Sequence, residues 1–187
     1  MPDDDLSSVP FPSAFTQPVK VAKEEDWEFG GVAIGDASQG LLVQLWHCTI
    51  EGGAVYVEAP SVAKTKLFDA PGVTDVALAF DQSMNPVVAY VQAGAAKFWW
   101  YDPTLEAMTF SDLPGATTPR CTLDDKRAFN TSGSDVILAY LKGRDLYFRK
   151  QRDRYTVEYL LATNVGGGLS TVAMGTNNRL QFGIGAV

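Results

Sequence analysis

The chain has 187 residues, of which 46% are hydrophobic, 11% aromatic and 20% charged. This composition fits one globular domain or one compact repeat array. Fifteen Lys and Arg against 22 Asp and Glu give a formal net charge of −7, which disfavours binding to nucleic-acid phosphates or to anionic lipid surfaces. We therefore expect no nucleic-acid partner. No apolar run has the length of a membrane span either, so we expect no membrane partner.

Residues 1–30 are predicted to form an N-terminal strap outside the regular sheets. The first ten residues, MPDDDLSSVP, lack the basic and apolar regions of a secretory signal, which predicts synthesis in a cytoplasm. Val19 and Val21 alternate with polar residues and predict one short strand. Trp27 and Phe29 then provide an apolar anchor that leads into the rest of the chain.

Short apolar segments recur through residues 31–187. LVQL, VVAY, ILAY and LQFG end at Leu45, Tyr90, Tyr140 and Gly183, at steps of 45, 50 and 43 residues. Each is rich in β-branched or aromatic residues, as strands are. Polar turn segments stand before them, at residues 36–40, 81–85, 130–134 and 175–178, so each segment is predicted to follow a hairpin turn.

A further strand follows three of these segments, at residues 54–59, 97–102 and 145–150. Their alignment places Tyr56, Trp99 and Tyr147 at one position, which predicts a recurring slot for an aromatic ring. The motif D-x-P-G, ending at Gly72 and at Gly115, then closes a last strand in two of the copies, because Pro and Gly stop a strand and reverse the chain.

These repeats predict an all-β, propeller-like array of about four four-stranded antiparallel blades. The blades are expected at about 31–72, 74–115 and 118–165, with a partial blade at 169–187 and equivalent strands at 41–48, 86–92 and 135–142. Either the N-terminal strand or a neighbouring subunit is expected to complete the last blade, because an unpaired edge strand exposes free amides. A β-sandwich or barrel is the alternative fold.

Two groups of side chains are candidates for an interface or for ligand stacking. Phe98 to Tyr101 are consecutive aromatics in one strand, so two rings face each way, and at least one pair is expected in the core. Basic residues between 142 and 154 alternate with Asp, which favours an ion-paired strand face over an anion or partner site. The candidate residues are Trp99, Trp100, Tyr101, Tyr56, Tyr147, Arg149 and Arg152.

Catalytic patterns are weak in this sequence. The single histidine, His47, lies in an apolar strand, and Cys48 and Cys121 are far apart, which predicts two buried thiols, with a disulfide as the alternative. One His and two distant Cys exclude a zinc site in practice, and no cofactor is expected.

Asp81 and Asp124 stand near the ends of predicted strands, and Asp36 has a similar position in the first copy of the repeat. We expect these carboxylates to form turns. A glycoside hydrolase using such acids is the third hypothesis for function.

The segment ILAYLKGRDLYFRKQRDRYTVEYLLA, residues 137–162, resembles segments of structural proteins from tailed bacteriophage particles. The resemblance implies a non-enzymatic tail-associated, collar or adaptor component that is present in many copies. Its location would be the virion, and its partners other structural proteins and copies of itself. The alternative from another class is a carbohydrate-binding propeller lectin or a host-receptor-binding module, with a cell-surface carbohydrate as partner and the cytoplasm as the alternative location.

Overall fold

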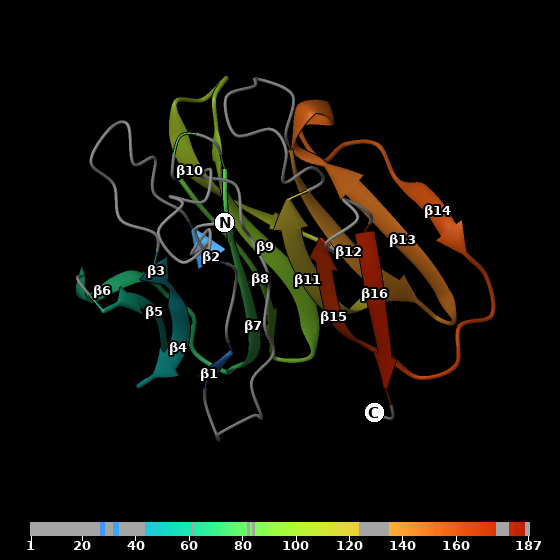
Figure 1. Ribbon diagram of the computed structural model, residues 1–187, viewed down its shortest axis with the longest axis horizontal. Coiled ribbons are helices and arrows are strands. Elements are labelled where there is room, and N and C mark those ends of the chain that lie inside the picture. The colour runs from blue at the N-terminus through green and yellow to red at the C-terminus, as the bar shows by residue number, and fades with distance from the viewer. Residues whose placement is uncertain are drawn as a thin grey trace, which may run out of the picture.

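The computed structural model describes residues 27–28, 32–33, 44–60, 62–81, 83, 85–123, 135–174 and 180–185, and these residues form antiparallel β-sheets (Figure 1). The predicted all-β class is therefore confirmed. Val19, Val21 and Phe29, together with the polar turns at 36–40, 130–134 and 175–178, lie outside the described residues.

Three of the sheets have four strands each. In the first sheet the order is β1 (Trp27–Glu28), β4 (His47–Glu51), β5 (Ala54–Ala59) and β6 (Val62–Asp69). In the second it is β7 (Val73–Phe80), β8 (Pro86–Gln92), β9 (Ala95–Asp102) and β10 (Ala107–Asp112). In the third it is β11 (Ala116–Leu123), β12 (Val136–Lys142), β13 (Asp145–Lys150) and β14 (Tyr159–Ala162).

Two smaller sheets accompany them. β15 (Gly168–Met174) pairs with β16 (Leu180–Gly185) after the third sheet, and β2 (Val32–Ala33) pairs with β3 (Gln44–Leu45). A short 3-10 helix, η3 (Gln151–Asp153), follows β13. The second and third sheets are simple up-and-down meanders, since neighbouring strands in the chain are neighbours in the sheet.

The predicted strands at 86–92 and 135–142 correspond to β8 and β12, but the first copy differs from its prediction. The expected strand at 41–48 is divided between β3 and the start of β4, which begins at His47. The first sheet takes its opening strand from Trp27–Glu28, which pair with Thr49 and Cys48. These two residues were expected in the strap outside the regular sheets, so that expectation is wrong for them. A two-residue strand is too short to produce an alternation pattern, so the sequence did not mark it.

One backbone hydrogen bond recurs in all three four-stranded sheets. It joins a residue beyond the outer strand to a carbonyl near the start of the third strand, and it runs from Ala70 to Gly53 (2.8 Å), from Leu113 to Ala96 (2.9 Å) and from Val165 to Arg144 (2.7 Å). In each case the acceptor lies three residues before the aromatic of the predicted slot. The hairpin registers agree with the predicted alignment for Tyr56 and Tyr147 but not for Trp99. The residues that begin the third strands after each turn are Ala54, Ala95 and Asp145, so Tyr56 and Tyr147 stand third from the turn, whereas Trp99 lies two residues further along β9.

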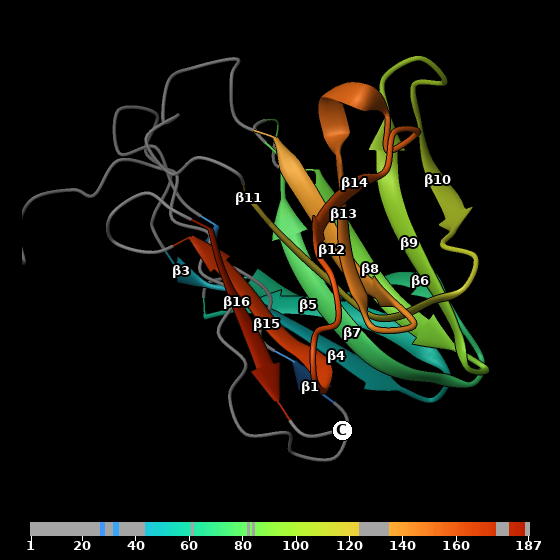
Figure 2. The same cartoon turned by 90° about the vertical axis from the view of Figure 1, so that its right-hand side faces the viewer.

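The second sheet is buried on both of its faces. On β8, Val88 and Tyr90 pack toward the first sheet, whereas Val87 and Ala89 pack toward the third. The sheets consequently follow one another face to face in chain order, with the second between the first and the third (Figures 1 and 2). The third sheet repeats this on β12, where Tyr140 faces the second sheet and Leu141 packs with Leu169 of β15.

Tyr155 fills the interface between the second and third sheets. Its ring meets Phe98 and Trp100 edge-on, each at 4.9 Å between ring centroids. The turn after η3 holds Tyr155 in the left-handed region, at φ 54°, a conformation that costs about 1 kcal/mol or more for a residue with a side chain. The buried aromatic contacts offset this cost, because each such pair contributes about 0.5–1.5 kcal/mol beyond area burial.

The Tyr155 hydroxyl is buried and makes no hydrogen bond within the described residues, so the ring rather than the hydroxyl should stabilise the fold. We predict that Tyr155→Phe leaves the free energy of unfolding unchanged or raises it by up to about 1 kcal/mol. Tyr155→Ala should lower it by about 3–5 kcal/mol, since it leaves a cavity. Urea denaturation of the three proteins measures both values. A Phe variant as unstable as the Ala variant would contradict this assignment.

Candidate functional site

The tryptophans predicted to be available for stacking are buried. Trp99 is 8% exposed and packs against Phe68 at 4.9 Å, in the core between the first and second sheets. Trp100 is 3% exposed and lies in the core between the second and third sheets. Because both faces of β9 are covered, alternation sends both pairs of rings into cores, and only Tyr101 stays partly exposed. The expectation of core packing is therefore confirmed for Phe98, Trp99 and Trp100, and the alternative of one exposed pair does not apply.

The other two candidate aromatics are half-buried and lie beside cations. Lys64 of β6 places its Nζ 5.0 Å from the centre of the Tyr56 ring. Tyr147 stacks on Tyr140, with 6.4 Å between ring centroids, and Lys142 lies 5.7 Å from the Tyr147 ring. Such cation–π contacts contribute about 0.5–1 kcal/mol at partly exposed sites, so both rings already have partners within this chain.

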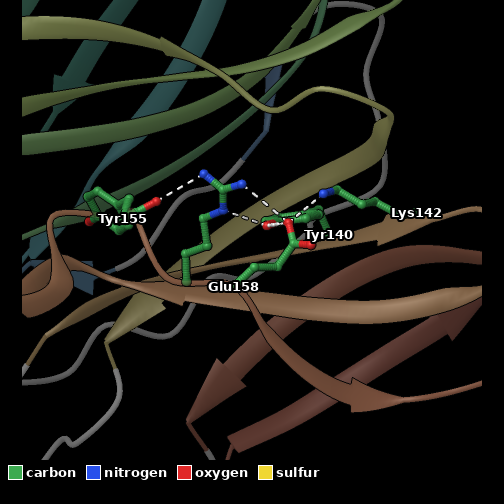
Figure 3. A network of polar contacts seen from close by, with 5 residues as sticks. Tyr140, Lys142, Tyr155 and Glu158 are labelled. Carbon is green, nitrogen blue, oxygen red and sulfur yellow. Dashed lines mark hydrogen bonds and ion pairs between the residues drawn. The ribbon is translucent and has the colours of Figure 1, made fainter.

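Arg149 belongs to a polar network on the third sheet (Figure 3). Its Nε donates to the Tyr140 hydroxyl at 2.7 Å, and its Nη1 donates to the Tyr155 carbonyl at 2.9 Å. The Glu158 carboxylate accepts from the Tyr140 hydroxyl at 2.7 Å and from the Lys142 ammonium at 2.5 Å, and Arg149 Nη2 lies 3.2 Å from the same oxygen. One carboxylate thus joins β12, β13 and the chain before β14.

The network changes the acidity of its members. Burial alone would raise the pKa of Glu158, but hydrogen bonds from Lys142, Tyr140 and Arg149 outweigh it and lower that pKa from 4.5 to about 2. Burial, and then the hydrogen bond to Glu158, raises the pKa of the Tyr140 hydroxyl well above its ordinary value. Glu158 is therefore ionised and Tyr140 protonated throughout the neutral range, which suits a structural network better than proton transfer.

Two further basic side chains of this region also form ion pairs. Arg152 pairs with Asp135, and Arg154 Nη2 lies 2.6 Å from Asp102 of β9. The second pair joins the third sheet to the second. The predicted ion pairing is confirmed for these residues, since Arg149 and Arg152 each have a carboxylate partner, although Arg152 and Arg154 lie in and directly after η3 and not on a strand.

The acids and thiols considered for catalysis have structural positions where they are described. Asp81 accepts from the backbone N–H groups of Ser83 and Asn85 at 2.9 and 2.8 Å, so it forms the expected turn. Asp36 and Asp124 lie outside the described residues. Cys48 and Cys121 are buried free thiols, as predicted. His47 opens β4 and is half-buried.

Sequence reasoning missed an exposed apolar surface on β14. This outer-strand surface consists of Val157, which precedes β14, and of Tyr159, Leu160 and Leu161 on the strand. Leu160 is 55% exposed and Leu161 is 45% exposed. Alternation would normally turn one of two consecutive leucines inward. Here the ladder shifts between Leu146 and Tyr147, which pair with Ala162 and Leu160. The resulting bulge leaves Leu161 without a cross-strand partner.

The outer-strand surface also has an unpaired backbone edge, and contacts with β13 and η3 hold its Tyr159 ring in place. β14 is the last strand of its sheet, and within the described part of the chain no strand pairs with its second edge. The Tyr159 ring stacks on Phe148 at 5.0 Å, with Lys150 Nζ 5.0 Å from the Tyr159 ring centre, and the Tyr159 hydroxyl donates to Asp153 at 2.9 Å. An exposed apolar edge strand of this kind is a template for pairing with another chain.

Comparison of this chain with protein-family models, curated proteins and solved structures finds no match. Among the described residues, His, Cys, Asp and Glu form no group of three or more that could hold a metal ion. The same residues contain no helix with the length and apolar character needed to cross a bilayer.

The depressed acidity of Glu158 predicts a pH-dependent contribution to stability. A carboxyl group with a lowered folded-state pKa stabilises the fold above its unfolded value, about 4.5, and this contribution is lost as pH falls toward about 2. Glu158→Gln should remove on the order of 2 kcal/mol at pH 7 and almost nothing at pH 2. Urea unfolding of both proteins between these pH values tests this, and a difference that stays constant with pH would contradict it.

Proposed function

We propose that this protein is a non-enzymatic structural protein that acts through protein–protein contacts, as a component of a tailed bacteriophage particle in the tail or head–tail region. The observation that carries the proposal is the outer-strand surface, because large apolar side chains on an open strand edge favour association with another chain. Placement in a phage particle depends on the resemblance of residues 137–162, which end in β14. The protein would then reside in the virion after synthesis in a bacterial cytoplasm.

The finer architecture that we propose is a propeller-like array. Each four-stranded sheet would be one blade, with β1, β7 and β11 as the inner strands and β6, β10 and β14 as the outer strands. The contacts of β7 with β1 and β11, and of β11 with β15, support this arrangement. Adjacent inner strands around a common axis are typical of propellers.

The fourth sheet, β15 and β16, would be the incomplete blade. Either of two segments would complete this blade by adding strands to it: the N-terminal segment around Val19 and Val21, or a neighbouring copy of the chain. Both would cover the second edge of β16, which no strand covers among the described residues. Completion by a neighbour would produce an oligomeric ring or tube.

The outer-strand surface predicts self-association that depends on its leucines. The double variant Leu160→Lys, Leu161→Lys should be monomeric where the natural chain is oligomeric, because two charges on an edge strand oppose pairing. Its melting temperature should change by no more than about 3 °C, since both side chains are exposed. Size-exclusion chromatography with light scattering measures the association, and thermal unfolding monitors the fold.

Leu105→Lys is the matched control, because Leu105 is 61% exposed, lies in the turn between β9 and β10, and is not part of the outer-strand surface. It should associate as the natural chain does. A monomeric natural chain, or association that survives the double variant, would refute this interface. Placement in a phage particle has a separate test, which is whether the gene neighbours genes for portal or tail proteins.

A further inference from the structure

A surface hollow of about 350 Å³ lies between the outer strand of the first sheet and the outer half of the second. It is lined by Asp69 of β6, Tyr90 and Gln92 of β8, Lys97 of β9, and Phe110 and Asp112 of β10. This volume lies within the range of small-ligand sites. None of these residues belongs to the outer-strand surface of β14.

Phe110 supplies an exposed ring held in a fixed position. The side chain is 55% exposed, yet its ring meets Phe68 edge-on at 5.3 Å and lies 6.4 Å from Trp99. The two buried aromatics support one part of the ring and leave the rest toward solvent. A supported aromatic ring of this kind can stack against the apolar face of a sugar without first being ordered, which lowers the entropic cost of binding.

The polar groups around Phe110 are hydrogen-bonding groups whose charges are already compensated. Lys66 Nζ lies 2.6 Å from the Asp69 carboxylate, and Lys97 Nζ lies 3.7 Å from that of Asp112. Gln92 donates its Nε2–H to the Pro71 carbonyl at 3.0 Å, which fixes the amide. Local charge balance favours a neutral ligand, since a charged one would have to displace an existing partner.

The Tyr90 hydroxyl adds a donor to this set. Burial, with a smaller contribution from Asp112, raises the pKa of Tyr90 to about 12, so the hydroxyl keeps its proton at neutral pH. The hollow therefore combines one aromatic face with carboxylate and amide acceptors and with ammonium and hydroxyl donors. Vicinal hydroxyls of a pyranose ring both donate and accept hydrogen bonds, so they match this mixture.

We infer that the hollow at Phe110 is a binding site for a neutral sugar, with the ring of Phe110 stacked on one pyranose face and Asp112 accepting from its hydroxyls. A second hollow of about 660 Å³ shares Lys97 and Asp112 with the first and continues from the end of β10 to the start of β11, along residues 112–117. A ligand of more than one ring therefore has room to extend. This site goes beyond the proposed assembly function and does not require it.

The test is binding of the full-length protein to an array of neutral and anionic glycans, with dissociation constants then measured by calorimetry for the neutral oligosaccharide that binds best. Asp112→Ala should raise the dissociation constant at least about tenfold and leave the melting temperature unchanged, because this exposed carboxylate makes only a long ion pair. Phe110→Ala should abolish binding, and Phe110→Trp should retain it, since the larger ring preserves stacking. Leu105→Ala, another exposed apolar residue outside the hollow, is the control and should bind as the natural chain does.

Three results would overturn the site: no neutral glycan bound, binding confined to sialylated or sulfated glycans, or undiminished binding by both Asp112→Ala and Phe110→Ala. The double variant Leu160→Lys, Leu161→Lys should bind sugar as well as the natural chain, because β14 is not part of the hollow. Failure of sugar binding and failure of self-association are therefore separate outcomes.

Discussion

Burial of both faces of the second sheet determines how the rest of the molecule is arranged. A sheet with one solvated face has a polar face, but β7, β8 and β9 carry apolar residues in both alternating sets. Two layers must therefore cover them, and the first and third sheets supply these layers. The third sheet has the same requirement on β12, which β15 helps to satisfy. Stacking of sheets in chain order follows from this requirement.

Arg120 joins three of these layers at their adjacent strands. From β11 it donates to the Asp75 carboxylate of β7 at 2.7 Å and to the Ser170 carbonyl of β15 at 3.0 Å. Both charged side chains of the pair are largely buried. A buried ion pair contributes little net stability compared with apolar packing, but loss of one partner is costly. Arg120 therefore disfavours other registers between the sheets, in addition to filling space.

The parts of the fold that the sequence predicted were those with long alternation patterns. β8, β12 and β13 were placed correctly because each combines β-branched or aromatic residues with a flanking turn of Gly or polar residues. Alternation also predicted that Phe98 and Trp100 point one way and Trp99 the other. It did not reveal that both sides are covered, because burial of the second face depends on sheets that are distant in sequence. For this reason the sequence left Trp99 and Trp100 as candidates for ligand stacking beside their expected place in the core.

The candidate surfaces were harder to foresee for related reasons. Exposure of both Leu160 and Leu161 results from a bulge, which depends on pairing with β13 and leaves no pattern in the sequence. The hollow at Phe110 depends on the approach of β6 to β10, which carry the two copies of the D-x-P-G motif. That motif was identified as a strand terminator, and its repetition gave a correct turn. The motif also places the carboxylates of Asp69 and Asp112 beside the exposed ring of Phe110. This proximity could not be predicted from the motif, because it depends on how the first and second sheets stack.

The account depends most directly on the contact between β7 and β11, and a double-mutant cycle on Asp75 and Arg120 tests it. Unfolding free energies of Asp75→Ala, Arg120→Met and the double variant would be measured in urea. If the sheets stack as described, each single variant loses about 3–5 kcal/mol, and the double variant loses less than their sum by at least about 2 kcal/mol. Effects that add to within about 0.5 kcal/mol would show that the two side chains do not meet. That result would contradict the stacking of the second and third sheets.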